Sequence, residues 1–317
     1  MNCSIVVPIY NEERSLPELF ERLHGALSKL SGQYEIIAVN DGSRDNSQAV
    51  LADLASANSN VRVLNFSRNF GQTAAIDAGI RHAKHDIVIP IDADLENDPA
   101  DIPRLMAKMG EGFDVVSGYR KDRWQGNWLS RKLPSLMANK LISWLSGVQL
   151  SDFGCTLKAY RREVVENLRL YGDMHRFIPA YASWNFNARI TEIPVSHTPR
   201  KHGKSNYGLG RIWKVVLDLL VLKFFADYSR RPIHLFGSMG SISILLGLVA
   251  GVLSIYFKFS VAYHKDFIQT PLPVLMAMLI VVGVILIMMG LLAEILIRTY
   301  FENHNQESYQ IKEKINF

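Results

Sequence analysis

The 317-residue sequence predicts an α/β domain with a mostly parallel sheet, followed by two membrane-spanning helices. Two observations support this fold class. In the first 120 residues, short apolar runs alternate with stretches of helical spacing, a pattern typical of a parallel sheet covered by helices on both faces. From about residue 233 the sequence changes to long apolar segments without charge, which are typical of helices in a lipid bilayer.

The sheet domain is predicted element by element from these runs. Five apolar runs indicate strands, at 4–8, 34–40, 61–66, 86–92 and 113–118. Helical spacing between them indicates helices at 15–30, 46–58, 72–84 and 100–110. Ser15 and Glu18 have the spacing of a capping box, with Pro17 in the first turn, where proline is tolerated.

Polar side chains follow three of the predicted strands, at Tyr10–Glu12, at Asp41 and at Asp92–Asp94. Ligands of open α/β sheets bind beyond the carboxyl ends of the strands. Acids and asparagine also end strands simply as turn residues, but three such ends together favour an active site. Two carboxylates one residue apart suit Mg²⁺ or Mn²⁺, which bind few carboxylates together with phosphate oxygens.

The second half of the chain contains two uncharged apolar segments, Ile233–Phe257 and Pro273–Ala293. The first would be roughly 37 Å long as a helix, against a hydrocarbon core of about 30 Å. Buried helices of a soluble protein are the alternative, and they are rarely uncharged over this length. Arginines flank the outer ends of the pair, so the positive-inside rule predicts a hairpin with both termini in the cytoplasm.

A basic segment precedes the first apolar segment. Between residues 200 and 231, eight lysines and arginines stand against Asp218 and Asp227; they are Arg200, Lys201, Lys204, Arg211, Lys214, Lys223, Arg230 and Arg231. This charge predicts contact with anionic lipid head groups or with a phosphate ligand at the membrane. Nucleic acid is the rival partner, but no nucleic-acid-binding module is present. Residues 207–231 are predicted to be interfacial helices, with a soluble core helix as the alternative.

Two further features concern the cellular compartment. Cys3 and Cys155 are predicted to be free thiols in a reducing environment. The N-terminus has no basic n-region followed by an apolar h-region, so no signal peptide is expected.

Five motifs in order resemble the inverting glycosyltransferases of family 2. They are SIVVPIYNEE, VNDGSRDNS, the DADLEN run, SGYR and DFGCTLKAYRR. The two terminal apolar segments and RKHGKSNYG narrow the resemblance to the polyprenyl-phosphate sugar transferases, similar to dolichyl-phosphate mannose synthase. The resemblance covers essentially the whole chain and implies a Rossmann-like GT-A fold, a nucleotide-sugar donor and a polyprenyl (undecaprenyl) phosphate acceptor.

The resemblance also implies roles for the residues at the strand ends. Pro8, Tyr10 and Glu12 would line the nucleobase and ribose pocket, and Asp41 would read the base. Asp92 and Asp94 would hold the metal, Mg²⁺ or Mn²⁺, and the diphosphate, with Glu96 in the same shell. The family usually has glutamine at the position of Glu96, and often a second aspartate at the position of Asn40, so both are departures.

The remaining matched positions concern the acceptor and catalysis. Arg120 and Arg131 match the arginines around the acceptor phosphate, and Arg200, Lys204 and Ser205 fall in a basic loop of the same function. Lys204 and Asn206 depart from that loop's Gly-x-Ser-Lys pattern. Asp152 matches an acid that faces the sugar, with a purely structural role as the alternative; for the two arginines the alternative is an ordinary surface position.

The predicted organisation is a cytoplasmic GT-A domain at 1–206, interfacial helices at 207–231, a transmembrane hairpin at 232–298 and a cytoplasmic tail at 299–317. We expect a multi-pass protein of the bacterial inner membrane that transfers glucose from UDP-glucose, with GDP-mannose or a modified aminosugar donor as alternatives. A processive polysaccharide synthase and a non-catalytic sugar-nucleotide binder are the rival functions. The family is often oligomeric, so the resemblance implies a homo-oligomer, suspected to be a tetramer, with a tail that could reach a neighbouring subunit.

Overall fold

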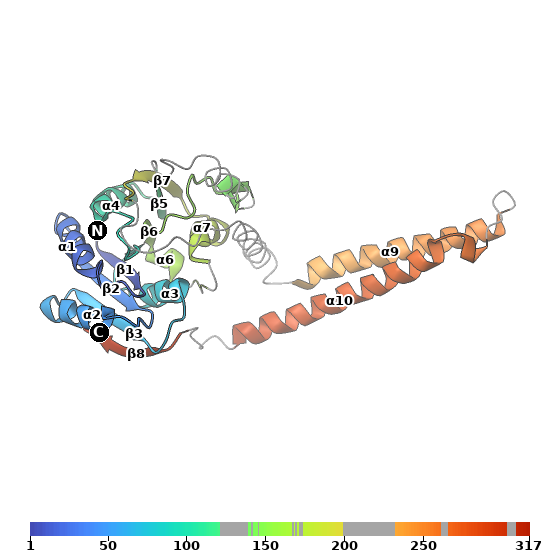
Figure 1. The fold of residues 1–317 in the computed structure, drawn as a ribbon. Coiled ribbons are helices and arrows are strands. Elements are labelled where there is room, and N and C mark those ends of the chain that lie inside the picture. The colour runs from blue at the N-terminus through green and yellow to red at the C-terminus, as the bar shows by residue number, and fades with distance from the viewer. Residues whose placement is uncertain are drawn as a thin grey trace. The chain divides into compact units, whose positions relative to one another are not determined.

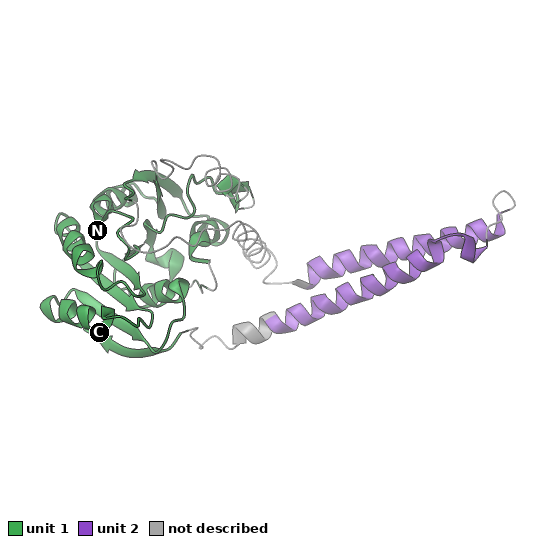
Figure 2. Cartoon of the chain, viewed as in Figure 1, with its two compact units in different colours: residues 1–223, 307–317 green, residues 224–306 purple. Residues whose placement is uncertain are grey.

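The computed structural model describes residues 1–120, 139–140, 142–144, 146–166, 168, 170, 174–198, 232–260, 266–302 and 309–317. The chain divides into two compact units (Figure 2). The first comprises Met1–Lys223 together with Glu307–Phe317, and the second comprises Phe224–Gln306.

An eight-stranded sheet forms the centre of the first unit, in the order β7-β5-β6-β4-β1-β2-β3-β8 (Figure 1). Its strands are β1 (Cys3–Ile9), β2 (Tyr34–Asn40), β3 (Val61–Phe66), β4 (Ile87–Pro90), β5 (Val115–Arg120), β6 (Lys158–Arg161), β7 (Ile190–Val195) and β8 (Ile311–Ile315). β1 pairs in parallel with β2 and β4, β2 with β3, and β5 with β7. β6 is antiparallel to both β4 and β5, so β4 and β5 run in the same direction. The carboxyl ends of β1, β2, β4 and β5 therefore meet at one edge of the sheet.

Helices cover both faces of this sheet, as the apolar strands require. One hydrophobic core holds the apolar faces of α1 (Leu16–Leu27), α2 (Ser47–Ala57) and α4 (Ile102–Gly110), the last preceded by a 3-10 turn, η1 (Pro99–Asp101). The other holds α3 (Gln72–His82), α6 (Arg162–Val165) and α7 (Ile178–Phe186), which follows the 3-10 turn η3 (Met174–Phe177). The predicted strands and helices of the first 120 residues are all present, with ends that differ by a few residues.

The predicted capping box at the start of α1 is wrong. Ser15 is the N-cap residue but makes no side-chain cap. Its hydroxyl instead lies 3.0 Å from the carbonyl oxygen of Glu12 and 2.9 Å from that residue's carboxylate. Glu18 pairs with Arg22 one turn later. The hydroxyl of Ser15 points toward Glu12 because the backbone N–H of Ser15 donates to the carbonyl of Glu12. This bond brings the oxygen atoms of Glu12 close to the hydroxyl.

The last residues of the chain are not a separate tail. β8 pairs antiparallel with β3 at the edge of the sheet and so belongs to the first unit. Tyr309, just before it, is buried and stacks on Phe66 with ring centroids 5.0 Å apart. The exposed edge of β3 offers unpaired backbone groups, which a following segment of this chain satisfies. In the structure this segment therefore pairs within its own chain.

The second unit contains two long helices, α9 (Pro232–Phe259) and α10 (Leu272–Glu302), with a 3-10 turn, η4 (Phe267–Gln269), between them. Both are long and apolar enough to cross a membrane. They pack closely because glycines face each other: a Cβ on Gly240 would lie 2.6 Å from the carbonyl oxygen of Gly283. The hydroxyl of Ser243 donates to the carbonyl of Leu279 across the pair.

Candidate active site

The loops after β1 and β2 are joined by hydrogen bonds at the carboxyl edge of the sheet. The backbone N–H of Asn11 donates to the hydroxyl of Ser43, and the backbone N–H of Arg44 donates to the Asn11 side chain. The backbone N–H of Glu12 donates to Ser47. Asn11 has a φ of 56°, which asparagine tolerates better than most residues. The two loops therefore form one rigid wall.

Of the three predicted nucleotide-binding residues near this wall, Tyr10 and Glu12 lie in the loop after β1 and Pro8 lies in β1 itself. Tyr10 is exposed at 42%, so its ring is free to contact a ligand. Pro8 lies in the central strand β1. The pairing of β1 with β4 ends at Val6, so the N–H that Pro8 lacks removes no hydrogen bond from that pairing. Glu12 is partly buried at the start of the turn that leads into α1.

Asp41 is buried at the end of β2 and holds the neighbouring loop. Its two carboxylate oxygens accept the backbone N–H groups of Phe70 at 2.6 Å and Gly71 at 2.9 Å, just before α3. Burial raises the pKa of Asp41, and the two N–H groups oppose that rise. The structure thus assigns Asp41 a positioning role for the loop before α3, and does not test the predicted contact with a base.

The acidic run after β4 leaves all three of its acidic residues partly exposed. Exposure alternates along Asp92–Asn97: Asp92, Asp94 and Glu96 are partly exposed, and the residues between them are buried. Leu95 adopts a φ of 62°, which turns the run sharply. The backbone N–H of Glu96 donates to the carboxylate of Asp94, which orients it.

Asp92 is held from both sides. Its carboxylate accepts the side-chain N–H of Gln72 and the hydroxyl of Thr156, each at 2.7 Å. Burial raises the pKa of Asp92 to about 6, and repulsion from Asp94 and Glu96 adds to that rise. A cation at this run would relieve the repulsion and favour the charged carboxylates.

These carboxylates fit a hard divalent cation that brings part of its own coordination shell. Among the residues that the structure describes, no three His, Cys, Asp or Glu side chains converge as a ready-made metal site. Mg²⁺ and Mn²⁺ need no such cluster when phosphate oxygens and water complete the shell. The predicted set of Asp92, Asp94 and Glu96 would hold the ion, with Asp92 oriented by Gln72 and Thr156.

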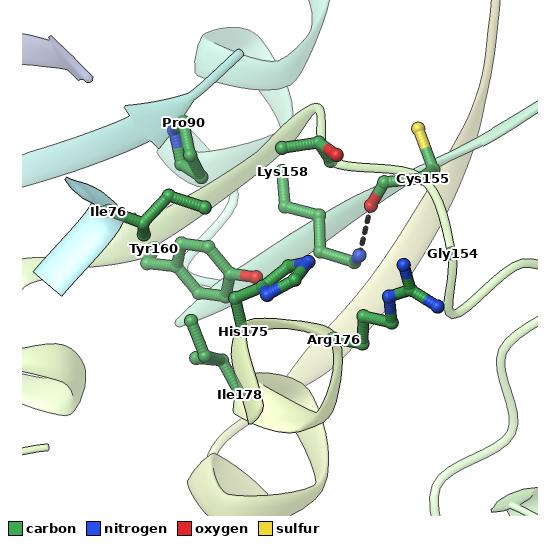
Figure 3. Close-up of a pocket in the computed structure, with 10 residues that line it drawn as sticks. Ile76, Pro90, Gly154, Cys155, Lys158, Tyr160, His175, Arg176 and Ile178 are labelled. Atoms are coloured by element: carbon green, nitrogen blue, oxygen red, sulfur yellow. Dashed lines mark hydrogen bonds between the residues drawn. The ribbon is translucent and has the colours of Figure 1, made fainter. Parts of the chain in front are cut away.

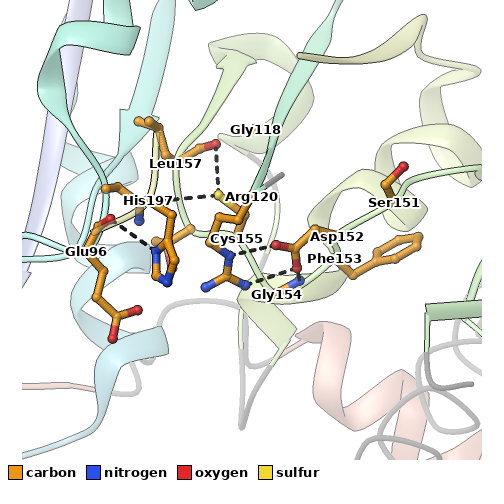
Figure 4. A network of polar contacts seen from close by, with 12 residues as sticks. Glu96, Gly118, Arg120, Ser151, Asp152, Phe153, Gly154, Cys155, Leu157 and His197 are labelled. Carbon is orange, nitrogen blue, oxygen red and sulfur yellow. Dashed lines mark hydrogen bonds and ion pairs between the residues drawn. The ribbon is translucent and has the colours of Figure 1, made fainter. Parts of the chain in front are cut away.

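Arg120 and Asp152, two predicted catalytic residues, form a buried ion pair (Figure 4). The Nε and Nη2 groups of Arg120 donate to the two oxygens of Asp152 at 2.7 and 3.0 Å. The backbone N–H of Gly154 donates to the same carboxylate. A bidentate pair fixes the plane of both groups. Asp152 is therefore an orienting residue for Arg120 in this structure.

The residues after β7 attach to the acidic run. The backbone carbonyl of Glu96 accepts the N–H of Thr198 at 3.0 Å. It also accepts the Nδ1–H of His197 at 3.2 Å (Figure 4). Ser196 donates its backbone N–H to Asp101. The segment that leads to the predicted basic loop is thereby fixed beside the carboxylates.

Other predicted positions fall elsewhere in the chain. Arg131, Arg200, Lys204 and Ser205 lie outside the described residues, as does the predicted interfacial segment 207–231. Sequence reasoning missed Gln72 and Thr156. Thr156 stands inside the DFGCTLKAYRR motif, which was its only signal, and Gln72 carried none beyond its place at a predicted helix start.

Comparisons with known proteins identify the family of the chain. The model of the glycosyl transferase family 2 matches residues 4–169. Dodecaprenyl-phosphate galacturonate synthase of Rhizobium johnstonii is 39% identical, covering 99% of this chain and 93% of the relative. Undecaprenyl-phosphate 4-deoxy-4-formamido-L-arabinose transferase of Klebsiella pneumoniae is 37% identical, covering 98% and 92%.

Solved structures share the fold at low sequence identity. Glucosyl-3-phosphoglycerate synthase of Mycobacterium tuberculosis, solved with Mn²⁺, UDP and phosphoglyceric acid, has a TM-score of 0.53 at 18% identity, covering 70% of this chain and 78% of that one. S. aureus TarS with UDP-GlcNAc has a TM-score of 0.51 at 19% identity, covering 82% and 74%. These likenesses establish the GT-A fold. By its family match and its near-full-length relatives, the chain belongs to glycosyl transferase family 2.

Proposed function

We propose that this protein transfers a sugar, with inversion, from a nucleotide diphosphate donor to polyprenyl phosphate at the cytoplasmic face of a bacterial inner membrane. The observation that carries the proposal is the meeting of the acidic run Asp92–Glu96 and the Arg120–Asp152 pair at one sheet edge. Both curated relatives are named for polyprenyl-phosphate acceptors and align over almost the whole chain.

The chemistry needs charge neutralisation more than proton transfer. A phosphate monoester has a second pKa near 6, so the acceptor oxygen is already an anion at neutral pH. The obstacle is its approach to an anionic diphosphate. A bound divalent cation would neutralise the leaving diphosphate. Arg120 supplies fixed positive charge for the acceptor, and Asp152 holds the guanidinium plane without accepting a proton.

The membrane location has its own support. The exposed faces of the hairpin helices are apolar, with Leu245 exposed at 61% and Val252 at 67%. Such an apolar surface is unfavourable in water and is compatible with lipid. The sheet adds a topological argument. β1 precedes the hairpin and β8 follows it, yet both lie in one sheet. The chain must return to the side from which it left, which supports an even number of crossings.

The test uses the full chain in lipid nanodiscs with polyprenyl phosphate and radiolabelled nucleotide sugars, with products partitioned into organic solvent. A lipid-linked monosaccharide is expected. Polymer in the aqueous phase would instead identify a processive synthase, and no product with any donor would identify a non-catalytic binder. Glucose from UDP-glucose is the sequence-based choice of sugar; the two relatives are named for galacturonate and for a formamido-arabinose.

Asp94→Asn provides the matched inactive variant. The neutral amide cannot balance a cation between carboxylate and diphosphate, so transfer and metal-dependent donor binding should both be lost. Asp98→Asn is the control, because Asp98 caps η1 with one side-chain oxygen that asparagine retains. Calorimetric binding of the nucleotide sugar with and without Mn²⁺ reports the effect. Normal metal dependence in Asp94→Asn would remove Asp94 from the metal site.

A further inference from the structure

A chain of polar side chains crosses the sheet from its last strand to the loop after β2. Asn40 ends β2, Asn65 lies opposite it on β3, and Glu313 lies opposite Asn65 on β8. The side chain of Asn40 donates to that of Asn65 at 2.9 Å, and Asn65 donates to the Glu313 carboxylate at 3.0 Å. Gln48 of α2 donates to the same carboxylate oxygen at 3.4 Å. Asn40 and Asn65 are each 2% exposed, so water has little access to the bond between them.

The chain continues into the wall that joins the loops after β1 and β2. The side-chain oxygen of Asn40 accepts the backbone N–H of Ser43 at 3.0 Å. The hydroxyl of Ser43 in turn accepts the backbone N–H of Asn11 at 3.0 Å. Consecutive hydrogen bonds thus connect the C-terminal strand to the loop that carries Tyr10 and Glu12.

The chemistry of the two ends fixes the orientation of both amides. An ionised carboxylate only accepts hydrogen bonds, and a backbone N–H only donates them. Glu313 therefore turns the NH₂ group of Asn65 toward itself, which leaves the Asn65 oxygen to accept from Asn40. Asn40 must then present its NH₂ group to Asn65 and its oxygen to Ser43. A carboxylate at the sheet edge thereby directs an acceptor toward the loop.

A second buried polar side chain, Lys158, shows the contrast with a purely local role. Lys158 lines a small pocket (Figure 3) and donates to the backbone carbonyls of Phe153 and Cys155, five and three positions before it. Those bonds hold a single loop. The bond from Asn65 to Glu313 instead joins segments 248 positions apart, one before the hairpin helices in the sequence and one after them.

We propose that Glu313, acting through Asn65 and Asn40, is a positioning residue for the nucleotide-binding loops, so that the C-terminal strand contributes to donor affinity. The inference rests on the proposed function, because it takes the wall formed by the loops after β1 and β2 as the nucleoside site. Without the carboxylate both amides can rotate, which weakens the bond that holds Ser43. The acidic run and Arg120 belong to β4 and β5, so the chemical step should keep its rate.

The first arm of the test compares Glu313→Ala with Lys312→Ala in the full chain in lipid nanodiscs. Lys312 is the exposed neighbour, so each variant removes one charged side chain from β8. Calorimetry with Mn²⁺ uses UDP or GDP, whichever the unmodified chain binds more tightly. Glu313→Ala should weaken this binding about three- to tenfold, the usual worth of one hydrogen bond, and Lys312→Ala should not. Equal affinity in the two variants, or no binding of either nucleotide to the unmodified chain, would overturn the inference.

The second arm moves the negative charge along the chain. Asn65→Asp alone places a carboxylate against that of Glu313, and neither can donate to the other. When Glu313→Gln is added, the new amide donates to the new carboxylate, which still accepts from Asn40. Nucleotide affinity should fall about three- to tenfold in Asn65→Asp and return near the unmodified value in the double variant. Glu313→Gln alone keeps an acceptor for Asn65 and should bind normally.

This exchange preserves the size of both side chains and the net charge, so it remains informative if Glu313→Ala fails to fold. Unfolding temperatures establish which variants are folded. Additive losses in the double variant would show that positions 65 and 313 do not act through each other, and would reject the positioning chain.

Transfer kinetics separate positioning from a general loss of structure. In Glu313→Ala, KM for the nucleotide sugar should rise about three- to tenfold while kcat stays within about twofold. A fall in kcat with unchanged KM would make Glu313 a general structural support and overturn the inference. If no sugar reaches polyprenyl phosphate but nucleotide binding follows the expected pattern, the proposed acceptor is wrong and the positioning chain stands. If lipid-linked sugar forms and all variants bind nucleotide equally, the transferase stands and the positioning chain is wrong.

Discussion

At the scale of single residues, two of the described ion pairs in the sheet domain have both side chains buried, Asp152 with Arg120 and Glu35 with Arg62. Asp152 holds Arg120 at the carboxyl edge, with side chains 9% and 6% exposed. Glu35, near the start of β2, accepts from Arg62 at 2.5 Å, from Ser4 and from the backbone of Lys84. Removing one partner of such a pair leaves a buried charge, which costs about 3–5 kcal/mol.

Asp152→Asn should therefore destabilise the domain by about 3–5 kcal/mol and reduce transfer steeply, because Arg120 loses its counter-charge and its fixed plane. Glu18→Gln is the comparison: its pair with Arg22 is 39% and 41% exposed, and such pairs contribute about 1 kcal/mol or less. Denaturant unfolding and the transfer assay measure both effects. Equal losses in the two variants would show that burial does not govern the Arg120 pair.

The hydrogen bonds of Glu35 predict how the stability of the fold changes in acid. Burial alone would raise the pKa of Glu35, but hydrogen bonds from Ser4, Lys84 and Arg62 outweigh burial and lower it. A carboxyl whose folded pKa lies below its unfolded value stabilises the fold above the unfolded pKa, and this contribution disappears as pH falls through the folded pKa. Glu35→Gln should be less stable at neutral pH and should lose less on acidification. Unfolding temperatures from pH 7 downward test this, and parallel profiles would contradict it.

At the scale of elements, close packing and strand pairing each depend on a few positions. β8 covers the edge of β3 and adds Glu313, whose carboxylate accepts the side chain of Asn65. Asn65 in turn accepts from Asn40, the residue before Asp41. The last strand therefore reaches the base of the predicted nucleotide loop. In the hairpin, glycines allow α9 and α10 to approach within van der Waals contact of each other's backbone.

Gly240→Val should weaken the hairpin, because a Cβ there would lie 2.6 Å from the Gly283 carbonyl oxygen, closer than packed atoms allow. Gly237→Val is the matched control, since a Cβ at Gly237 meets nothing closer than 4.0 Å. Thermal unfolding in detergent micelles compares the two variants, with a lower unfolding temperature expected only for Gly240→Val. Identical temperatures would mean that this contact is not formed in the folded protein.

At the scale of the whole molecule, the order of the strands constrains the path of the chain. Along the chain, the hairpin lies between two segments of a single sheet. In the proposed membrane arrangement, both ends of the hairpin therefore lie on one side of the membrane and the turn between α9 and α10 on the other. Ile268 in η4 is 97% exposed, and Lys312 of β8 is also exposed.

Cysteine labelling of intact cells tests this arrangement. Ile268→Cys should react with a membrane-impermeant maleimide, and Lys312→Cys should react only after permeabilisation. The background should be low, because burial raises the pKa of the native Cys3 and Cys155 thiols to about 11. Labelling of both introduced cysteines from the same side would reject the two-crossing hairpin.

The sequence by itself determined the features that depend on local pattern. The apolar runs predicted β1 to β5, the charge-free segments predicted α9 and α10, and strand ends located Asp41 and the acidic run. These features follow from side-chain period and solvent preference, which a short window of residues contains. Such a window also predicted the capping box at Ser15, which the structure replaced with a contact to Glu12.

Only the tertiary structure decided which distant side chains meet. Arg120 and Asp152 are 32 positions apart, Thr73 and His175 are 102 apart, and Asn65 and Glu313 are 248 apart. β6 inserts antiparallel between β4 and β5, and this strand order brings Lys158 beneath the loop that carries Asp152. Such contacts depend on the order and direction of whole strands, which follow from the global balance of buried surface and hydrogen bonds. No local pattern in the sequence records that balance.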